Sequence, residues 1–209
     1  MISNKLITFE GIDGSGKSTQ ISLLNEWFES LKIDKLNIRE PGGNNISELI
    51  RTILLDKKNK INSLSEMLLF LAARSQLTED VIIPALREDK FVICDRFIDS
   101  TIVYQGYGRN LGVELINKIN LLATQNILPF LTIYINIDVD LSISRRALDT
   151  NDRMESEGKS FLKNVKKGYD KLAVLYPNRI YIVNGNESIP EIQKKIRNII
   201  KEKYEGLLC

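Results

Sequence analysis

The sequence predicts an α/β fold with a five-stranded parallel sheet flanked by helices on both faces, and three observations indicate it. Short β-branched runs alternate with longer segments of helical period, which is the pattern of βαβ units. A glycine-rich loop joins the first run to the first helical segment. The chain has 209 residues, 43% of them hydrophobic, which suits one sizeable core. We therefore expect a single domain spanning 1–209.

The predicted strands are short runs that are apolar at most positions. Strands of a parallel sheet are buried on both faces, so they lack the alternation that is typical of half-exposed strands. The five runs are Lys5–Phe9, Leu36–Arg39, Phe91–Asp95, Leu131–Ile137 and Arg179–Val183.

The predicted helices carry apolar residues three and four positions apart. In the first of them Ile21, Leu24 and Phe28 form one stripe, which is expected to face the sheet. The polar stretch at 149–158 lacks this period and is expected to be an exposed connection. The helical segments are Lys17–Leu31, Ser47–Leu55, Ser65–Arg87, Val113–Thr124, Val139–Leu148, Lys159–Leu175 and Ile189–Tyr204.

Composition argues against several classes of protein. The net charge of +2 is too small for a general nucleic-acid binder, so no polymeric nucleic-acid partner is expected. No signal peptide is apparent, and no apolar stretch approaches the roughly 20 residues that span a bilayer, so no membrane partner is expected. Two cysteines, Cys94 and Cys209, form no disulfide framework and favour a reducing, cytoplasmic location. Histidine is absent, so catalysis must use carboxylates, lysines, arginines, hydroxyls or bound ions.

A phosphate-binding motif lies between the first strand and the first helix. Residues 11–18 read GIDGSGKS and match G-x-x-x-x-G-K-[ST] in the strand–helix context that the motif requires. Lys17 is expected to reach the β- and γ-phosphates of ATP, and the Ser18 hydroxyl to ligate Mg²⁺. The alternative, a connecting turn without a ligand, is disfavoured by that context. The ATP-binding residues predicted here are Gly11, Ile12, Asp13, Gly14, Ser15, Gly16, Lys17, Ser18 and Thr19.

A second predicted strand, Phe91–Asp95, ends on a carboxylate. Ligands of open α/β sheets bind at the carboxyl edge of the strands, so Asp95 is a candidate to hold Mg²⁺ through water. Arg96 beside it is a candidate to pair with a phosphate. An ordinary strand end with a surface ion pair is an equal alternative, because the run 133–138 also ends on an acid.

The arginines favour a kinase for a small acceptor over a GTPase. The string nearest to a guanine-reading signature, 117–120, lacks the required acid. A small-acceptor kinase needs a second phosphate site and a mobile cationic cover that excludes water. We expect that cover to be a lid at about 145–158. The candidate cations are Arg39, Arg51, Arg74 and Arg96 before the lid, and Arg145, Arg146 and Arg153 in or beside it.

Several separate strings resemble the thymidylate kinase family in its bacterial form. They occur in order along most of the chain: FEGIDGSGKST at 9–19, REPGG at 39–43, LLFLAAR at 68–74, DRFIDSTIVYQG at 95–106 and DRME at 152–155. The resemblance implies the three-layer P-loop nucleoside-monophosphate-kinase fold. It also implies transfer of the ATP γ-phosphoryl group to thymidine monophosphate (dTMP) on the route to dTTP.

The resemblance assigns an acceptor-binding role to eight residues. Phe70 resembles the ring that stacks on thymine, and Arg74 the partner of a thymine carbonyl. Arg96 resembles the clamp on the dTMP phosphate, with Arg51 a weaker candidate. The remaining residues are Asp13, which resembles the acceptor of the sugar 3′-hydroxyl, Thr101 and Gln105, which lie where the family reads the rest of the base, and Tyr104, which resembles the ring that favours deoxyribose.

In the family a catalytic arginine comes from the phosphate-binding loop or from the lid. The variable loop residues here are not basic, so the lid is expected to supply it through Arg153, while Arg145 and Arg146 contact ATP. A homodimer is also implied. Two alternatives stay open: a kinase for another nucleotide or deoxynucleoside, and a nucleotide-binding regulator with little activity.

Overall fold

The computed structural model describes residues 3–146, 153–154 and 157–205, and their core is one parallel sheet. All five predicted strands are confirmed, with ends that move by at most one residue. The strand order is β2-β3-β1-β4-β5, and every pairing is parallel. The strands are β1 (Leu6–Glu10), β2 (Lys35–Arg39), β3 (Phe91–Asp95), β4 (Leu131–Asn136) and β5 (Ile180–Asn184).

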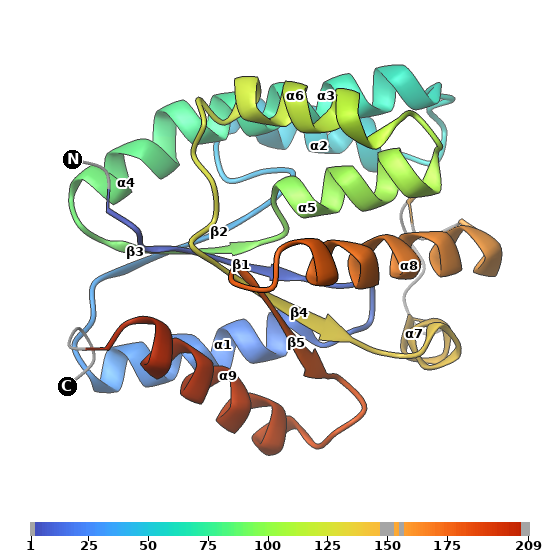
Figure 1. The fold of residues 1–209 in the computed structure, drawn as a ribbon. Helices are drawn as coiled ribbons and strands as arrows, with labels where there is room; N and C mark the ends of the chain where they lie inside the picture. The colour runs from blue at the N-terminus through green and yellow to red at the C-terminus, as the bar shows by residue number, and fades with distance from the viewer. Residues whose placement is uncertain (1–2, 147–152, 155–156, 206–209) are drawn as a thin grey trace.

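The described helices form two layers around this sheet (Figure 1). They are α1 (Lys17–Ser30), α2 (Asn45–Leu55), α3 (Ser63–Leu77), the π-helical turn η1 (Thr78–Ile82), α4 (Ile83–Arg87), α5 (Ile98–Thr101), the π-helical turn η2 (Ile102–Gly108), α6 (Val113–Ala123), α7 (Val139–Arg146), α8 (Lys159–Leu175) and α9 (Ile189–Lys203).

Three layers result from this arrangement. Helices α1 and α9 cover one face of the sheet, and α3 to α6 with α8 cover the other (Figure 1). The first face packs Leu24 and Phe28 of α1, from the predicted apolar stripe, against buried strand residues such as Ile133. The three-layer α/β architecture expected from the sequence is therefore confirmed. None of the helices in the described part of the chain is long and apolar enough to cross a membrane.

Two helical regions differ from the sequence expectation. The single helix predicted over 65–87 begins at Ser63 and is divided by the π-helical turn η1, after which Pro84 stands in the first turn of α4. Proline has no N–H to donate, and a π-helical turn accommodates such an irregularity within a continuous helix. The stretch 98–108, which is not among the predicted helical segments, is helical as α5 and η2.

Parallel pairing brings the functional strings to one edge of the sheet. Asp95 is in register with Arg39 on one side and with Phe9 on the other, and the loop at 11–16 follows directly after β1. Because parallel strands all end at the same edge, this loop, the 39–43 segment and Asp95 meet there.

Candidate active site

A cavity of about 720 Å³ crosses this edge of the sheet. The phosphate-binding loop lines one end of it, and residues of α3, α5 and η2 line the other. Every predicted site residue lines this cavity except Gly11 and Ile12 at the base of the loop, and Arg153. The cavity therefore joins the two sites that the sequence predicts separately.

The backbone of the loop at 11–16 depends on glycine. Gly11, Gly14 and Gly16 all have positive φ, and a Cβ on Gly11 would lie 2.5 Å from the Ile135 carbonyl oxygen. Helix α1 begins immediately after Gly16, so its free N–H groups face the same space. The Lys17 ammonium is buried and donates to the carbonyl oxygens of Gly11 (3.2 Å) and Ile12 (3.3 Å).

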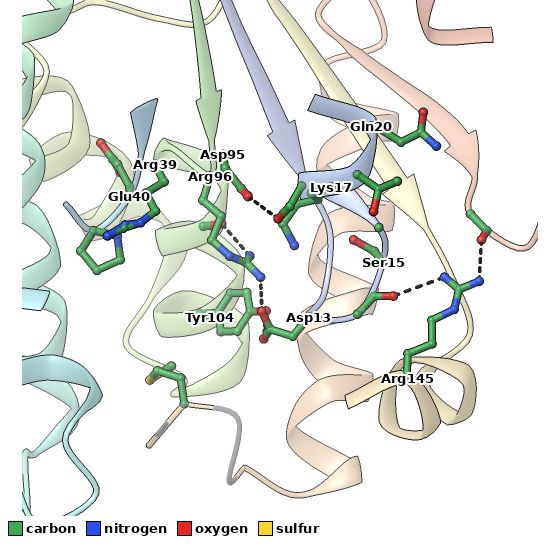
Figure 2. Close-up of a pocket in the computed structure, with 18 of the residues that line it drawn as sticks. Asp13, Ser15, Lys17, Gln20, Arg39, Glu40, Asp95, Arg96, Tyr104 and Arg145 are labelled. Atoms are coloured by element: carbon green, nitrogen blue, oxygen red, sulfur yellow. Dashed lines mark hydrogen bonds and ion pairs between the residues drawn. The ribbon is translucent and has the colours of Figure 1, made fainter. Parts of the chain in front are cut away.

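Ser18 and Asp95, the two predicted metal ligands, lie side by side. The Ser18 hydroxyl donates to Asp95 Oδ2 over 3.3 Å (Figure 2). The other carboxylate oxygen, Asp95 Oδ1, is buried and has no hydrogen-bond partner among the described residues. A buried acceptor without a donor beside a hydroxyl fits a hard cation such as Mg²⁺, which prefers oxygen ligands. The described residues contain no cluster of three metal-binding side chains, so phosphates and water would have to complete the coordination.

Arg96 is the centre of the charged cluster between the two ends of the cavity. Its Nη2 donates to Asp13 Oδ1 over 2.6 Å, and its guanidinium lies over the Tyr104 ring at 5.1 Å (Figure 2). The Tyr104 hydroxyl donates to the second oxygen of Asp13 over 3.1 Å. Burial alone would raise the pKa of Asp13, but Arg96 and Lys17 lower it to about 2. Asp13 is therefore a carboxylate at neutral pH.

Glu10 is linked to this cluster through two hydroxyl groups that also contact Arg96, and no role was predicted for it from the sequence. It is fully buried and accepts hydrogen bonds from the N–H groups of Phe97 (2.8 Å) and Ser100 (3.3 Å) and from the hydroxyls of Ser100 (2.6 Å) and Tyr169 (2.7 Å). Arg96 donates to both of these hydroxyls. Desolvation and Asp99 raise the pKa of Glu10 to about 7. The available signal was an acid at the end of an apolar strand.

Arg74, predicted to meet a thymine carbonyl, is 2% exposed and its donors are engaged within the protein. Nε and Nη2 bind Glu40, at 2.8 and 2.6 Å. Nη1 donates to the side chains of Thr101 and Asn120, both at 2.7 Å, and Nη2 to the Phe97 carbonyl. These bonds use all five guanidinium N–H groups. Arg74 lines the cavity, and its contact with a base stays a prediction.

Arg153, the predicted catalytic arginine, does not line the cavity and lies beyond the end that α3, α5 and η2 line. Its Nη1 donates to Glu66 Oε2 over 2.6 Å, and its Nε to the Leu54 carbonyl over 2.9 Å. Glu66 also accepts from Gln105 and Arg109, and neither Glu66 nor Arg109 was identified from the sequence. A signal was present, since Glu66, Phe70 and Arg74 follow one another at four-residue spacing on α3.

The remaining predicted residues take three positions. Phe70, which is half-buried, lines the cavity together with Thr101 and Gln105 at the end formed by α3, α5 and η2. Arg51, also at that end, donates to the Pro41 carbonyl over 2.9 Å. Arg145 lies on the opposite side of the phosphate-binding loop and donates to the carbonyl oxygens of Gly14 and Gly185 (Figure 2).

Two other candidates are less informative. Arg39 lines the cavity but is ion-paired with Glu48. The predicted lid at about 145–158 falls largely on 147–152 and 155–156, which lie outside the described residues, as does the side chain of Arg146. Lid movement stays a prediction.

Comparison with known proteins gives a consistent family. A family model described as thymidylate kinase matches residues 9–196. The chain is 47% identical to thymidylate kinase from Thermosipho africanus and 44% identical to that from Thermoanaerobacter pseudethanolicus, in each case covering 96% of this chain and 99% of the relative. The crystal structure of thymidylate kinase from Ehrlichia chaffeensis superposes with a TM-score of 0.76 at 34% identity, covering 93% of this chain and 97% of that one.

Proposed function

Because the chain belongs to the thymidylate kinase family and is a dTMP kinase that forms dTDP, we propose that the cavity of about 720 Å³ holds both ATP and dTMP with their phosphates facing each other. The observation that carries this proposal is the continuity of that cavity from Lys17 to Gln105. Two anionic substrates that must react in line need such a shared, enclosed space.

We assign the donor end to the loop at 11–19 and the acceptor end to α3, α5 and η2. The loop amides, Lys17 and Arg145 bind the triphosphate, and Arg96 with Arg51 binds the phosphate of dTMP. Phe70 stacks on thymine, whose polar edge meets Thr101 and Gln105. Tyr104 lies against the sugar of dTMP, and Asp13 accepts a hydrogen bond from the 3′-hydroxyl of that sugar. The Tyr104 hydroxyl already donates a hydrogen bond to Asp13. Arg74 lines the pocket, and because its five N–H groups are engaged within the protein, a bond to a thymine carbonyl requires one of them to be shared or exchanged.

Mg²⁺ is the proposed metal, held by Ser18 directly and by Asp95 through water. When bound, the ion neutralises charge on the β- and γ-phosphates. The protein needs no general base, because a dTMP phosphate oxygen is already nucleophilic. Lys17 and Arg96 hold the two phosphates in line and offset their mutual repulsion. Arg153 is the proposed source of further positive charge for the transferred phosphoryl group.

A homodimer is proposed from three neighbouring helices, α2, α3 and α6, which form the outer layer of one face (Figure 1). Each carries large apolar side chains that are about half exposed or more, at helical spacing. An apolar surface of this kind is typical of a subunit interface. We define this surface as the α2/α3/α6 face, made of Ile46, Leu49, Ile53, Leu64, Leu68, Leu115 and Leu122. A cytoplasmic location is proposed as well, supported by the free thiol of Cys94.

The test is steady-state phosphorylation with ATP and Mg²⁺ of dTMP, dUMP, dCMP, dGMP and thymidine. We expect dTMP to have the highest kcat/KM. A preference for another acceptor would contradict the assignment of the acceptor end. ATP binding without product from any acceptor would favour the nucleotide-binding regulator.

A further inference from the structure

Glu66 joins the base end of the cavity to Arg153 and, through Arg109, to Glu157. Its carboxylate is buried and accepts four hydrogen bonds. Oε1 accepts from Gln105 Nε2 (2.9 Å) and Arg109 Nε (3.1 Å), and Oε2 accepts from Arg109 Nη2 (3.0 Å) and Arg153 Nη1 (2.6 Å). Arg109 also pairs with Glu157 at 2.6 Å. Two acids and two arginines thus balance each other around one glutamine.

The contact with Glu66 determines which way the Gln105 amide points. An ionised carboxylate only accepts hydrogen bonds, so the amide must turn its NH₂ group toward Glu66. Burial acts to raise the pKa of Glu66, but hydrogen bonds from Arg109, Gln105 and Arg153 lower it overall. Glu66 is therefore ionised at neutral pH, and the reversed amide, with oxygen against oxygen, is unfavourable.

The oxygen of the amide is left for the substrate. Gln105 is 2% exposed and lines the cavity, and its Oε1 accepts no hydrogen bond from any residue within the described ranges. Thr101 offers a donor where Gln105 offers an acceptor. Its Oγ1 accepts a hydrogen bond from Arg74, which leaves the hydroxyl proton free to be donated. The pocket therefore presents one acceptor and one donor to a base.

This pair of groups matches thymine and opposes cytosine. Thymine carries a donor at N3–H and an acceptor at O4, whereas cytosine carries an acceptor at N3 and a donor at its 4-amino group. Gln105 Oε1 facing cytosine N3 would place two acceptors against each other in a buried site. Such mismatches discriminate more strongly than differences in shape.

We propose that Glu66 is a positioning residue for substrate specificity, which holds the Gln105 amide in the orientation that accepts thymine and uracil and rejects cytosine. The proposal rests on the assignment of the acceptor end made above. Glu66 acts through Gln105 and does not touch the substrate.

Glu66→Gln tests this directly. The Oε2 position faces two arginine N–H groups and the Oε1 position only one, and arginine cannot accept. The oxygen of the new amide is therefore expected at the Oε2 position, which leaves its NH₂ group facing Gln105. Gln105 must then turn its own oxygen toward residue 66 and present its NH₂ group to the cavity. We expect the ratio of kcat/KM for dTMP to that for dCMP to fall about ten- to hundredfold. The ratio for dTMP to dUMP should not change, because both bases carry N3–H.

Arg109→Met is the matched control, because it removes a neighbour of Glu66 but keeps the bond from Gln105. Its dTMP to dCMP ratio should equal that of the wild type. The double variant Glu66→Gln/Arg109→Met restores the charge balance and removes the donor that would face the new NH₂ group. It should show the same fall in the ratio, and it serves as the test if the single variant does not fold.

Two outcomes overturn the proposal. Equal losses of activity toward all three nucleotides in the folded variants would mean that Glu66 only supports the structure. A dTMP to dCMP ratio of kcat/KM that also falls in Arg109→Met would mean that the order of the whole charged cluster, not the orientation of the Gln105 amide, determines the preference for dTMP. Failure of the proposed function would be seen separately, as a wild-type protein that does not favour dTMP.

Discussion

Arg96 concentrates several interactions in one side chain. It has a positive φ of 69°, immediately after β3, and so directs its guanidinium back across the cavity toward Asp13. A non-glycine residue in this conformation costs of order 1 kcal/mol or more, and such residues cluster at functional sites. The bond from its own N–H to the Phe9 carbonyl and its contacts with Ser100 and Tyr169 hold it there.

The substitution Lys17→Ala should abolish most of the turnover. The ammonium is buried beside the loop carbonyls, and in the proposed assignment it is the positive group of the loop that binds the transferred phosphate. We expect kcat to fall by at least on the order of 10²-fold, with an unchanged thermal unfolding midpoint. Steady-state kinetics and circular dichroism measure the two. Lys163→Ala, on the exposed face of α8, is the control. Near-normal turnover in Lys17→Ala would overturn the assignment.

Glu10→Gln should change how stability depends on pH. The pKa of Glu10 is raised from 4.5 to about 7, so its folded state favours the protonated form. The contribution of Glu10 to the free energy of unfolding is therefore fully present below pH 4.5 and is lost as the pH rises through about 7. A shift of this size corresponds to about 3 kcal/mol.

The measurement is urea denaturation of both proteins at pH 5 and pH 8. We expect the wild type to lose stability relative to Glu10→Gln at the higher pH. A difference between the two proteins that does not vary with pH would show that Glu10 titrates normally in the folded state.

At the scale of elements, α3 is the helix on which the acceptor end depends. Its N-terminus is capped by Asn62, whose side chain accepts from the Ser65 N–H over 2.9 Å. Glu66, Phe70 and Arg74 follow along one side of the helix, where Glu66 binds Arg153, Phe70 lines the cavity and Arg74 binds Glu40. A rotation of α3 would therefore move all three together.

Arg153→Ala tests the lid segment. If Arg153 supplies charge to the transferred phosphoryl group, kcat should fall by about 10³-fold or more. Stability should fall by about 1–3 kcal/mol, because Glu66 and the Leu54 carbonyl lose a donor. Arg87→Ala, exposed at the end of α4, is the control. A loss of stability with near-normal kcat would restrict Arg153 to a structural role.

At the scale of the whole molecule, the donor end and the acceptor end of the cavity lie together because the sheet is parallel. Strands β1 and β3 deliver the phosphate-binding loop and Asp95 to one edge, and residues of α3, α5 and η2 line the proposed acceptor end of the cavity there. The outer side of the same helical layer is the α2/α3/α6 face. Association through it would bury these apolar side chains.

Leu68→Glu should prevent that association. Leu68 is 49% exposed within the α2/α3/α6 face, and a charge buried there without a partner is strongly unfavourable. Light scattering after size exclusion should give the monomer mass of 23.9 kDa for the variant and twice that mass for the wild type. Leu175→Glu, at the exposed end of α8, should remain dimeric. A monomeric wild type would contradict the proposed homodimer.

Much of the site was predictable because its signals are local in the sequence. The glycine spacing at 11–16 is readable since a phosphate-binding loop is made by consecutive backbone groups. The resemblance to thymidylate kinases rests on short strings, and it was confirmed by relatives over nearly the full chain. The acceptor contacts drawn from that resemblance remain predictions.

By itself the sequence determined the strands, most helices, the phosphate-binding loop and the family, because hydrophobic period and short motifs depend on neighbouring residues. Tertiary structure alone decided that Glu10 supports Arg96, that Glu40 occupies Arg74, and that Glu66 faces Gln105. The hydrogen bonds behind these arrangements, which include the bond from Ser100 to Glu10, join residues 34 to 90 positions apart. No local pattern encodes such pairs, since they exist only after the parallel sheet has brought distant strand ends to one edge.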